Sequence, residues 1–208
     1  MKKQKILMSS LLLAFIMSCL SGLNEAKAAP IASQTVTAVL GTVSSVESYG
    51  GNVSTTIDET GSLTTPLDPG FKIISNIGTT QALTLTATTT STSGEVNAFS
   101  SSNGNVYIAL SNITTPPTSE AITNAQSESP QAASNPNVIC YAVTPPTNIE
   151  GQLEYSWNSS GNYYDVNLSH QGDTITQLVV PAASAKPNTF NGNDESGSYQ
   201  AIVILSYN

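Results

Sequence analysis

The side chains that most often carry out covalent catalysis are scarce in this 208-residue sequence. Nucleophilic catalysis needs a thiol or hydroxyl beside a base, and beyond residue 28 the sequence holds one cysteine, Cys140, and one histidine, His170. Cys140 lies in the apolar run Val-Ile-Cys-Tyr-Ala-Val at 138–143, where a cysteine packs as a small hydrophobic residue. We therefore interpret Cys140 as a core residue, and with no second cysteine beyond residue 28 we expect no intramolecular disulfide in the mature chain.

Carboxylates offer two further kinds of chemistry, and neither pattern fits well. Glu150 and Glu154 are close enough in sequence to suggest a glycosidase pair, but in so acidic a chain we interpret them as solvated acids. Residues 191–195 (Asn-Gly-Asn-Asp-Glu) carry oxygen ligands suited to Ca²⁺, but their spacing does not match a calcium-binding loop, and a polar turn is the better interpretation. We expect no metal, no cofactor and no enzymatic activity.

The aromatic residues between 151 and 169 could form a sugar-stacking surface, but the expected strand register places Trp157 in the core instead. If residues 151–157 and 163–169 form a hairpin whose paired residue numbers add up to 321, one face collects six bulky side chains. The three pairs are Leu153–Leu168, Tyr155–Val166 and Trp157–Tyr164. A slip of one residue would scatter them between the two faces. This register predicts Trp157 in the core and leaves Tyr163 as the aromatic residue here that is free for a ligand.

The charge of the chain excludes several classes of partner. The sequence has a net charge of −8, but four of its six lysines and only one of its 14 acids lie in the first 28 residues. The remainder carries Lys72 and Lys186 against 13 acids, a net charge of −11. Binding to nucleic acid requires a basic surface, so we expect no nucleic-acid partner. Anionic membrane surfaces and phosphorylated ligands are disfavoured for the same reason.

The first 28 residues have the three parts of a secretory signal peptide. Lysines at positions 2, 3 and 5 precede a largely apolar stretch at 6–23, and Ala26-Lys27-Ala28 forms a cleavage site of the small-x-small type. We expect export. Two alternatives stay open: a membrane anchor, which four serines within the stretch disfavour, and a lipoprotein acylated on Cys19, because residues 16–19 loosely resemble a bacterial lipobox.

Short runs of β-branched and aromatic residues between Gly, Pro and Asn predict an all-β chain. The exception is a helical turn at Ser119–Gln126 inside an irregular stretch at 114–136. The predicted strands are 34–46, 53–57, 71–77, 82–90, 94–100, 105–112, 137–144, 151–157, 163–169, 174–180 and 198–207. Many short strands in one domain, without helical crossovers, predict a β-sandwich.

The two ends of the expected mature chain carry the strongest functional signal. Near the start, residues 36–43 (Val-Thr-Ala-Val-Leu-Gly-Thr-Val) combine apolar and small residues in a β-type run. The C-terminal strand is apolar at every odd position from Tyr199 to Leu205, and Tyr207 is penultimate. A final strand of this kind is either the last core strand or a strand that pairs with a partner.

These termini resemble those of the subunits of chaperone–usher pili, and in particular the disulfide-free colonisation-factor type of fimbrial subunit. The resemblance covers the two ends and the overall composition, and Gly197-Ser198-Tyr199 with Tyr207 is similar to the C-terminal motif of that family. It departs from the common pilins in three respects. Gly197 lies closer to the C-terminus, the disulfide is missing, and Val39 and Leu40 are adjacent, so the N-terminal segment is not strictly alternating.

The resemblance implies an immunoglobulin-like β-sandwich that lacks one strand and is completed by a donor strand from another copy. It implies a signal peptide at 1–28, an N-terminal donor segment at 29–46 and a β-sandwich domain at 47–208. The implied donor residues are Val36, Ala38, Leu40 and Val43. The implied assembly strand, where the chaperone binds, carries Tyr199, Ala201, Val203, Leu205 and Tyr207.

The implied function is that of a structural subunit of a surface fimbria that supports adhesion. Its implied partners are other copies of itself or related pilins, a periplasmic chaperone, an usher and a host receptor, and its route leads through the periplasm to the cell surface. The alternative is a monomeric secreted β-sandwich that binds glycan or host protein through loops such as 114–136 and through Tyr163.

Overall fold

The computed structural model describes residues 44–77, 79–127, 137–169, 172–181 and 195–208. Internal contacts divide the chain into residues 1–44 and 45–208, and every described residue after Ser44 belongs to the second unit. The predicted signal peptide, the proposed donor residues Val36 to Val43, and His170 lie outside the described residues. Among the described residues, no helix has the length and apolar character needed to cross a membrane.

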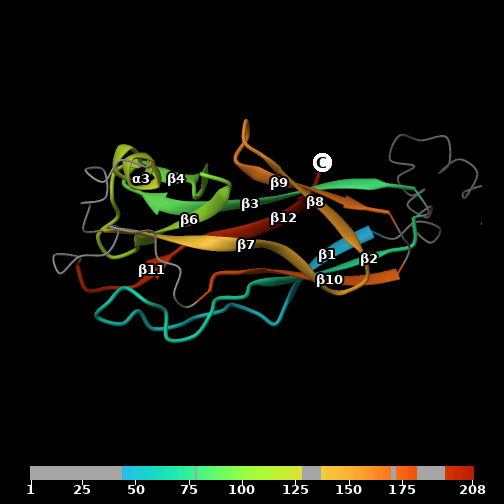
Figure 1. Ribbon diagram of the computed structural model, residues 1–208, viewed down its shortest axis with the longest axis horizontal. Helices are drawn as coiled ribbons and strands as arrows, with labels where there is room; N and C mark the ends of the chain where they lie inside the picture. The colour runs from blue at the N-terminus through green and yellow to red at the C-terminus, as the bar shows by residue number, and fades with distance from the viewer. Residues whose placement is uncertain (1–43, 78, 128–136, 170–171, 182–194) are drawn as a thin grey trace, which may run out of the picture. The chain divides into compact units, whose positions relative to one another are not determined.

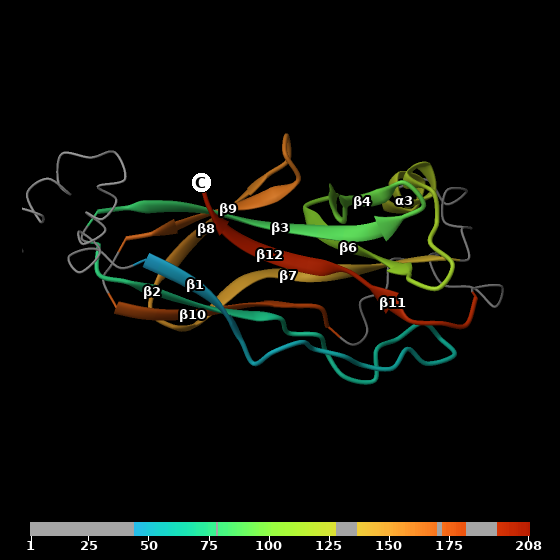
Figure 2. The same cartoon turned by 180° about the vertical axis from the view of Figure 1, so that it is seen from behind.

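Two antiparallel sheets make up the second unit (Figures 1 and 2). Sheet 1 contains, in order, β1 (Ser44–Tyr49), β2 (Gly70–Ser75), β10 (Gly172–Val179), β7 (Val138–Glu150), β6 (Asn105–Asn112) and β11 (Tyr199–Gln200), with β5 (Phe99–Ser102) also paired to β6. Sheet 2 contains, in order, β12 (Ile202–Tyr207), β3 (Gln81–Ser91), β9 (Tyr163–Leu168) and β8 (Leu153–Asn158), with β4 (Gly94–Asn97) paired to β3. The predicted all-β sandwich is confirmed.

The main core lies between the two sheets and follows the period-two pattern of the strands. In sheet 1, Ile108 and Leu110 of β6 and Ile139 and Tyr141 of β7 point inward, and Leu83 of β3 meets them from sheet 2. All five belong to one buried apolar cluster. The residues between them point to the outer faces.

The predicted helix is present as α3 (Ser119–Gln126), which covers part of the outer face of sheet 1. Thr118 caps it, because its hydroxyl accepts a hydrogen bond from the Ala121 amide at 3.1 Å. Ile122 and Ala125 pack with Cys140 of β7 in a second apolar cluster. Cys140 is fully buried and its thiol donates a hydrogen bond to the Ala125 carbonyl at 3.4 Å. The prediction of a core cysteine is confirmed.

The β8–β9 hairpin has the predicted register, with Leu153, Tyr155 and Trp157 opposite Leu168, Val166 and Tyr164. Trp157 packs edge-on against Tyr164 and Phe99, with ring centroids 4.9 and 6.0 Å away. The prediction that Trp157 belongs to core packing is confirmed.

Two predicted strands are each divided between the sheets, which corrects the prediction of continuous strands at 94–100 and 198–207. In the first, β4 pairs with β3 in sheet 2, whereas β5 pairs with β6 in sheet 1. In the second, β11 pairs with β6, whereas β12 pairs with β3. The crossing points are Ala98 and Ala201. The Ala98 amide donates to the Ala87 carbonyl in sheet 2, and the Ala98 carbonyl accepts from the Ala109 amide in sheet 1.

The predicted strand at 53–57 is also corrected. Residues 51–57 form one arm of a hairpin whose other arm is residues 62–67, and an isolated bridge joins Ile57 to Leu63. The turn between the arms is held by Asp58, whose carboxylate accepts hydrogen bonds from the amides of Thr60 and Ser62. We call residues 51–67 the wall hairpin.

Candidate functional site

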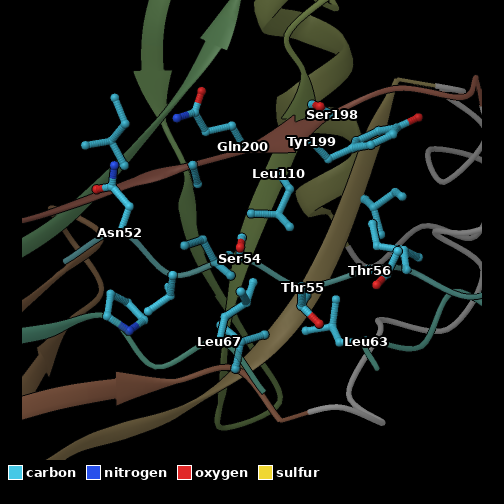
Figure 3. A pocket seen from close by; sticks show the side chains of 18 of the residues that line it. Asn52, Ser54, Thr55, Thr56, Leu63, Leu67, Leu110, Ser198, Tyr199 and Gln200 are labelled. Carbon is cyan, nitrogen blue, oxygen red and sulfur yellow. The ribbon is translucent and has the colours of Figure 1, made fainter. Parts of the chain in front are cut away.

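An apolar groove with a volume of about 960 Å³ lies between the wall hairpin and the C-terminal strand. One side is formed by residues 51–57 and the other by residues 195–203. Figure 3 shows Leu110 between the segment of Ser54 to Thr56 and the strand that carries Tyr199 and Gln200, with Leu63 and Leu67 on the other side of that segment. We refer to this feature as the groove.

The floor of the groove is the inner face of sheet 1. Ile108 and Leu110 of β6 and Ile139 of β7 reach it from the middle of the sheet, and Val180, just after β10, completes it. All four belong to the main core cluster. The groove is therefore a section of the sandwich core that sheet 2 does not cover.

One side of the groove is fixed to the core by a buried polar contact. The hydroxyl of Tyr141, which is fully buried, donates a hydrogen bond to the Gly61 carbonyl in the turn of the wall hairpin at 2.9 Å. Leu63, next to this turn, is itself a core residue, and Leu67 exchanges two backbone hydrogen bonds with Val180. The inner arm is thus anchored at both ends.

The outer arm of the wall hairpin, residues 51–57, is held mainly by threonine hydroxyls. Thr55 Oγ1 lies 3.0 Å from Thr65 Oγ1 and also accepts a hydrogen bond from the Thr65 amide. One backbone hydrogen bond, from the Thr64 amide to the Thr56 carbonyl, joins the two arms here. Within the described residues, no backbone hydrogen bond crosses the groove from residues 51–57 to β12.

The other side of the groove is an edge strand. Among the described strands, β12 pairs with β3 alone, so its second backbone edge borders the groove. Tyr199, Ala201 and Val203 pack against the core but remain half-buried, whereas Leu205, beyond the groove, is only 7% exposed. The core-facing residues Tyr199, Ala201 and Val203 are thus less buried than Leu205, the next core-facing residue of the segment.

The groove carries negative charge at its rim. Asp58 and Glu59 of the wall hairpin and Glu195 contribute to its lining, and none of the described lining residues is a lysine or arginine. The hydrogen bond from the Thr60 hydroxyl, with those from the Ser62 and Thr60 amides, lowers the pKa of Asp58. Lys72 lies outside the groove in a salt bridge with Asp173 at 2.7 Å, which raises the pKa of Lys72. The site favours an apolar, uncharged or basic ligand over an anion.

The structure places the predicted assembly residues in two positions. Tyr199, Ala201 and Val203 line the groove, and Leu205 is buried beside it. Tyr207 lies at the end of β12 and is 38% exposed. Ile202 and Ile204, on the opposite face, are 43% and 38% exposed and point away from the core. The even and odd positions of the last strand thus have the different environments that their alternation predicts.

The floor and wall residues were not predicted as site residues. Leu63, Leu67, Leu110 and Ile139 are ordinary apolar residues in the sequence, and their alternation indicates only that they face a core. That they face an uncovered part of it depends on the division of the C-terminal segment between the sheets at Ala201.

The chain matches no family model, no curated protein and no solved structure. The groove therefore has to be interpreted from its own geometry. It holds apolar side chains and a negative rim, and among the described strands β12 borders it with a backbone edge that pairs with no other strand. These features suit the binding of an extended apolar segment.

Proposed function

We propose that the groove accepts an extended β-segment from another copy of this chain, and that the protein is a structural subunit of a surface fimbria. The observation that carries the proposal is the incompletely covered start of β12, where Ala201 and Val203 are half-buried and, among the described strands, β12 pairs with β3 alone. Exposed strand edges pair readily with other chains. Strand addition provides main-chain hydrogen bonds, and alternate side chains of the added strand fill the groove.

A strand added along β12 would extend sheet 2 and cover the floor of the groove. Its inward side chains would meet Ile108, Leu110 and Ile139, which belong to the facing sheet. The segment that precedes β1 offers Val36, Ala38 and Leu40, which would share one face of an extended strand, and Val43 beyond them. Burial of an apolar side chain of this size stabilises by about 1.5–3 kcal/mol. The donor and the groove are different parts of the chain, so the contact is head-to-tail and generates a filament.

A fimbrial function would also explain the expected signal peptide and the need for a periplasmic chaperone and an usher during assembly. An exported subunit with an open groove would expose unpaired strand edges and apolar surface, which favour aggregation. A periplasmic chaperone that binds along the C-terminal strand would cover both until a donor segment replaces it. We include in this proposal that the sandwich has immunoglobulin-like strand connectivity and that the fimbria supports adhesion.

Deletion of residues 29–43 tests the proposal. The truncated chain should be exported but should form neither filaments nor the ladders that resist SDS, because it keeps the groove and loses the donor. Ladders of normal length from the truncated chain would refute the donor-strand mechanism. Size-exclusion chromatography of the full chain without a chaperone separates the alternative: a stable monomer would indicate a monomeric binding module.

A further inference from the structure

The outer face of sheet 2 carries a row of polar side chains that crosses β8, β9, β3 and β12. Ser156 of β8 lies opposite Asp165 of β9, Asp165 opposite Thr84 of β3, and Thr84 opposite Ser206 of β12. All four are exposed or half-buried. Adjacent strands lie about 4.8 Å apart, so hydroxyl and carboxylate groups recur at that spacing across a pleated surface. The Thr84 and Ser206 hydroxyl oxygens lie 3.1 Å apart.

Tyr163 lies on this face, two residues before Asp165, and its ring is fixed in place. Its hydroxyl accepts a hydrogen bond from Asn158 Nδ2 at 3.0 Å. Its ring packs closely over Gly161, where an added Cβ would lie 2.1 Å from Tyr163 Cε1. Any larger residue at position 161 would force the ring to move. The side chain is half-buried and held in one orientation, so a ligand that stacks on it loses little binding free energy to the conformational entropy of the side chain.

Asp165 stands beside this ring with one oxygen available. Asn158 Nδ2 donates to Asp165 Oδ2 at 3.2 Å, so one amide group orients both the ring and the carboxylate. Within the described residues, Asp165 Oδ1 has no hydrogen-bond partner. Residues two apart on a strand lie about 6.6 Å apart along it. At this spacing, the Tyr163 ring and the Asp165 carboxylate could both contact the same small cyclic ligand.

We propose that this surface, Tyr163 with Asn158, Asp165, Thr84 and Ser156, binds a neutral pyranose. The apolar face of the sugar stacks on the Tyr163 ring, while adjacent sugar hydroxyls donate to Asp165 Oδ1 and exchange hydrogen bonds with the hydroxyls of the polar row. The negative charge of the chain and of Asp165 selects uncharged sugars over sialylated or sulfated ones. The site lies on the sheet and not in the loop at 114–136, and it does not depend on the groove.

Saturation-transfer NMR on the full chain tests this site. The probes are the methyl glycosides of galactose, glucose, mannose and N-acetylglucosamine, together with lactose and its sialylated form. Three variants are compared: Tyr163→Ala, Asp165→Asn and Tyr49→Ala. Tyr49 is an exposed tyrosine of sheet 1 that serves as the matched control. Asp165→Asn retains the shape of the side chain, so it tests the site independently if the Tyr163→Ala variant fails to fold.

We expect transfer to the ring protons of at least one neutral glycoside. Tyr163→Ala should weaken that binding by about tenfold, since an aromatic stacking contact accounts for about 1.4 kcal/mol, Asp165→Asn should weaken it several-fold, and Tyr49→Ala should leave it unchanged. Lactose should bind better than its sialylated form. Absence of transfer from every neutral glycoside, equal binding in all three variants, or preference for the sialylated sugar would each overturn the proposal.

Discussion

Substitution of Val203 by threonine separates the effect of the groove on assembly from its effect on folding. Val203 points toward the core and lines the groove, but it is only half-buried. Threonine has nearly the same shape as valine and differs by a hydroxyl in place of a methyl group. In the open groove that hydroxyl can reach water, whereas beneath an added strand it would be buried.

The expected magnitude follows from this difference in burial. A hydroxyl buried without a partner costs about 1–3 kcal/mol, which corresponds to donor binding that is about 5- to 150-fold weaker. Ile204→Thr is the matched control, because Ile204 is the next residue, faces outward and is 38% exposed. Its hydroxyl stays in water in both states, so donor binding should change by no more than about twofold.

The assay titrates a synthetic peptide of residues 33–43 onto the chain that lacks residues 29–43, and urea unfolding of the same proteins gives their stability. Val203→Thr should weaken peptide binding strongly and change the free energy of unfolding by less than about 1 kcal/mol. Equal binding by the Val203→Thr and Ile204→Thr variants would refute the reasoning. So would a loss of stability in the free chain as large as the loss of binding.

Three further predictions concern the structure that supports the site. Tyr141→Phe removes the buried hydrogen bond to the Gly61 carbonyl and should lower the free energy of unfolding by about 1–3 kcal/mol. The control Tyr49→Phe, at an exposed position, should change it by less than about 0.5 kcal/mol. Equal urea midpoints for the two variants would contradict the anchoring role of Tyr141. Burial raises the pKa of Tyr155 and of Tyr164 from 10.0 to about 12. The stabilisation linked to these hydroxyls is therefore fully present below pH 10 and is lost as the pH rises toward 12. An absorbance titration should show Tyr155 and Tyr164 ionising later than the exposed tyrosines, and a single transition for all eight tyrosines near pH 10 would contradict this burial. Trp157→Ala removes the ring that contacts Phe99 and Tyr164 and should cost about 3 kcal/mol in urea unfolding, whereas a change below about 0.5 kcal/mol would indicate a surface residue.

Local sequence pattern was enough to predict the elements whose partners are close in sequence. The register of Trp157 opposite Tyr164 agrees with the alternation of the two strands, because a slip of one residue would put apolar residues on both faces. The helix at Ser119–Gln126 has its signal in the capping residue Thr118 and the prolines before it. In both cases the chain has few alternatives to choose among.

The parts that could not be predicted depend on pairing between distant segments. Nothing near Ala98 or Ala201 indicates that the chain changes sheets there, because each half of the divided segment is an ordinary β-run. The strand predicted at 137–144 continues as β7 to Glu150 although Pro145 and Pro146 cannot donate backbone hydrogen bonds. These prolines fall where the β10–β7 register shifts between Gln177 and Val179, a β-bulge that accommodates them.

The same limit explains why half of the site was predicted. The alternation of the C-terminal strand predicts that Tyr199, Ala201 and Val203 share one face. It does not predict which strand lies opposite them, and so it cannot show that the floor at Leu110 and Ile139 is left uncovered.

Disulfide trapping between copies tests the donor-strand account most directly. One copy carries Ala201→Cys in the groove, and a second carries Ala38→Cys, Leu40→Cys or Thr37→Cys in the donor segment. Side chains alternate along a strand, so Ala38 and Leu40 should face the floor while Thr37 should face away. The account predicts a disulfide-linked dimer with Ala38→Cys or Leu40→Cys and none with Thr37→Cys. Absence of a dimer with both inward positions, or a bond within one chain when both substitutions are on the same copy, would contradict it.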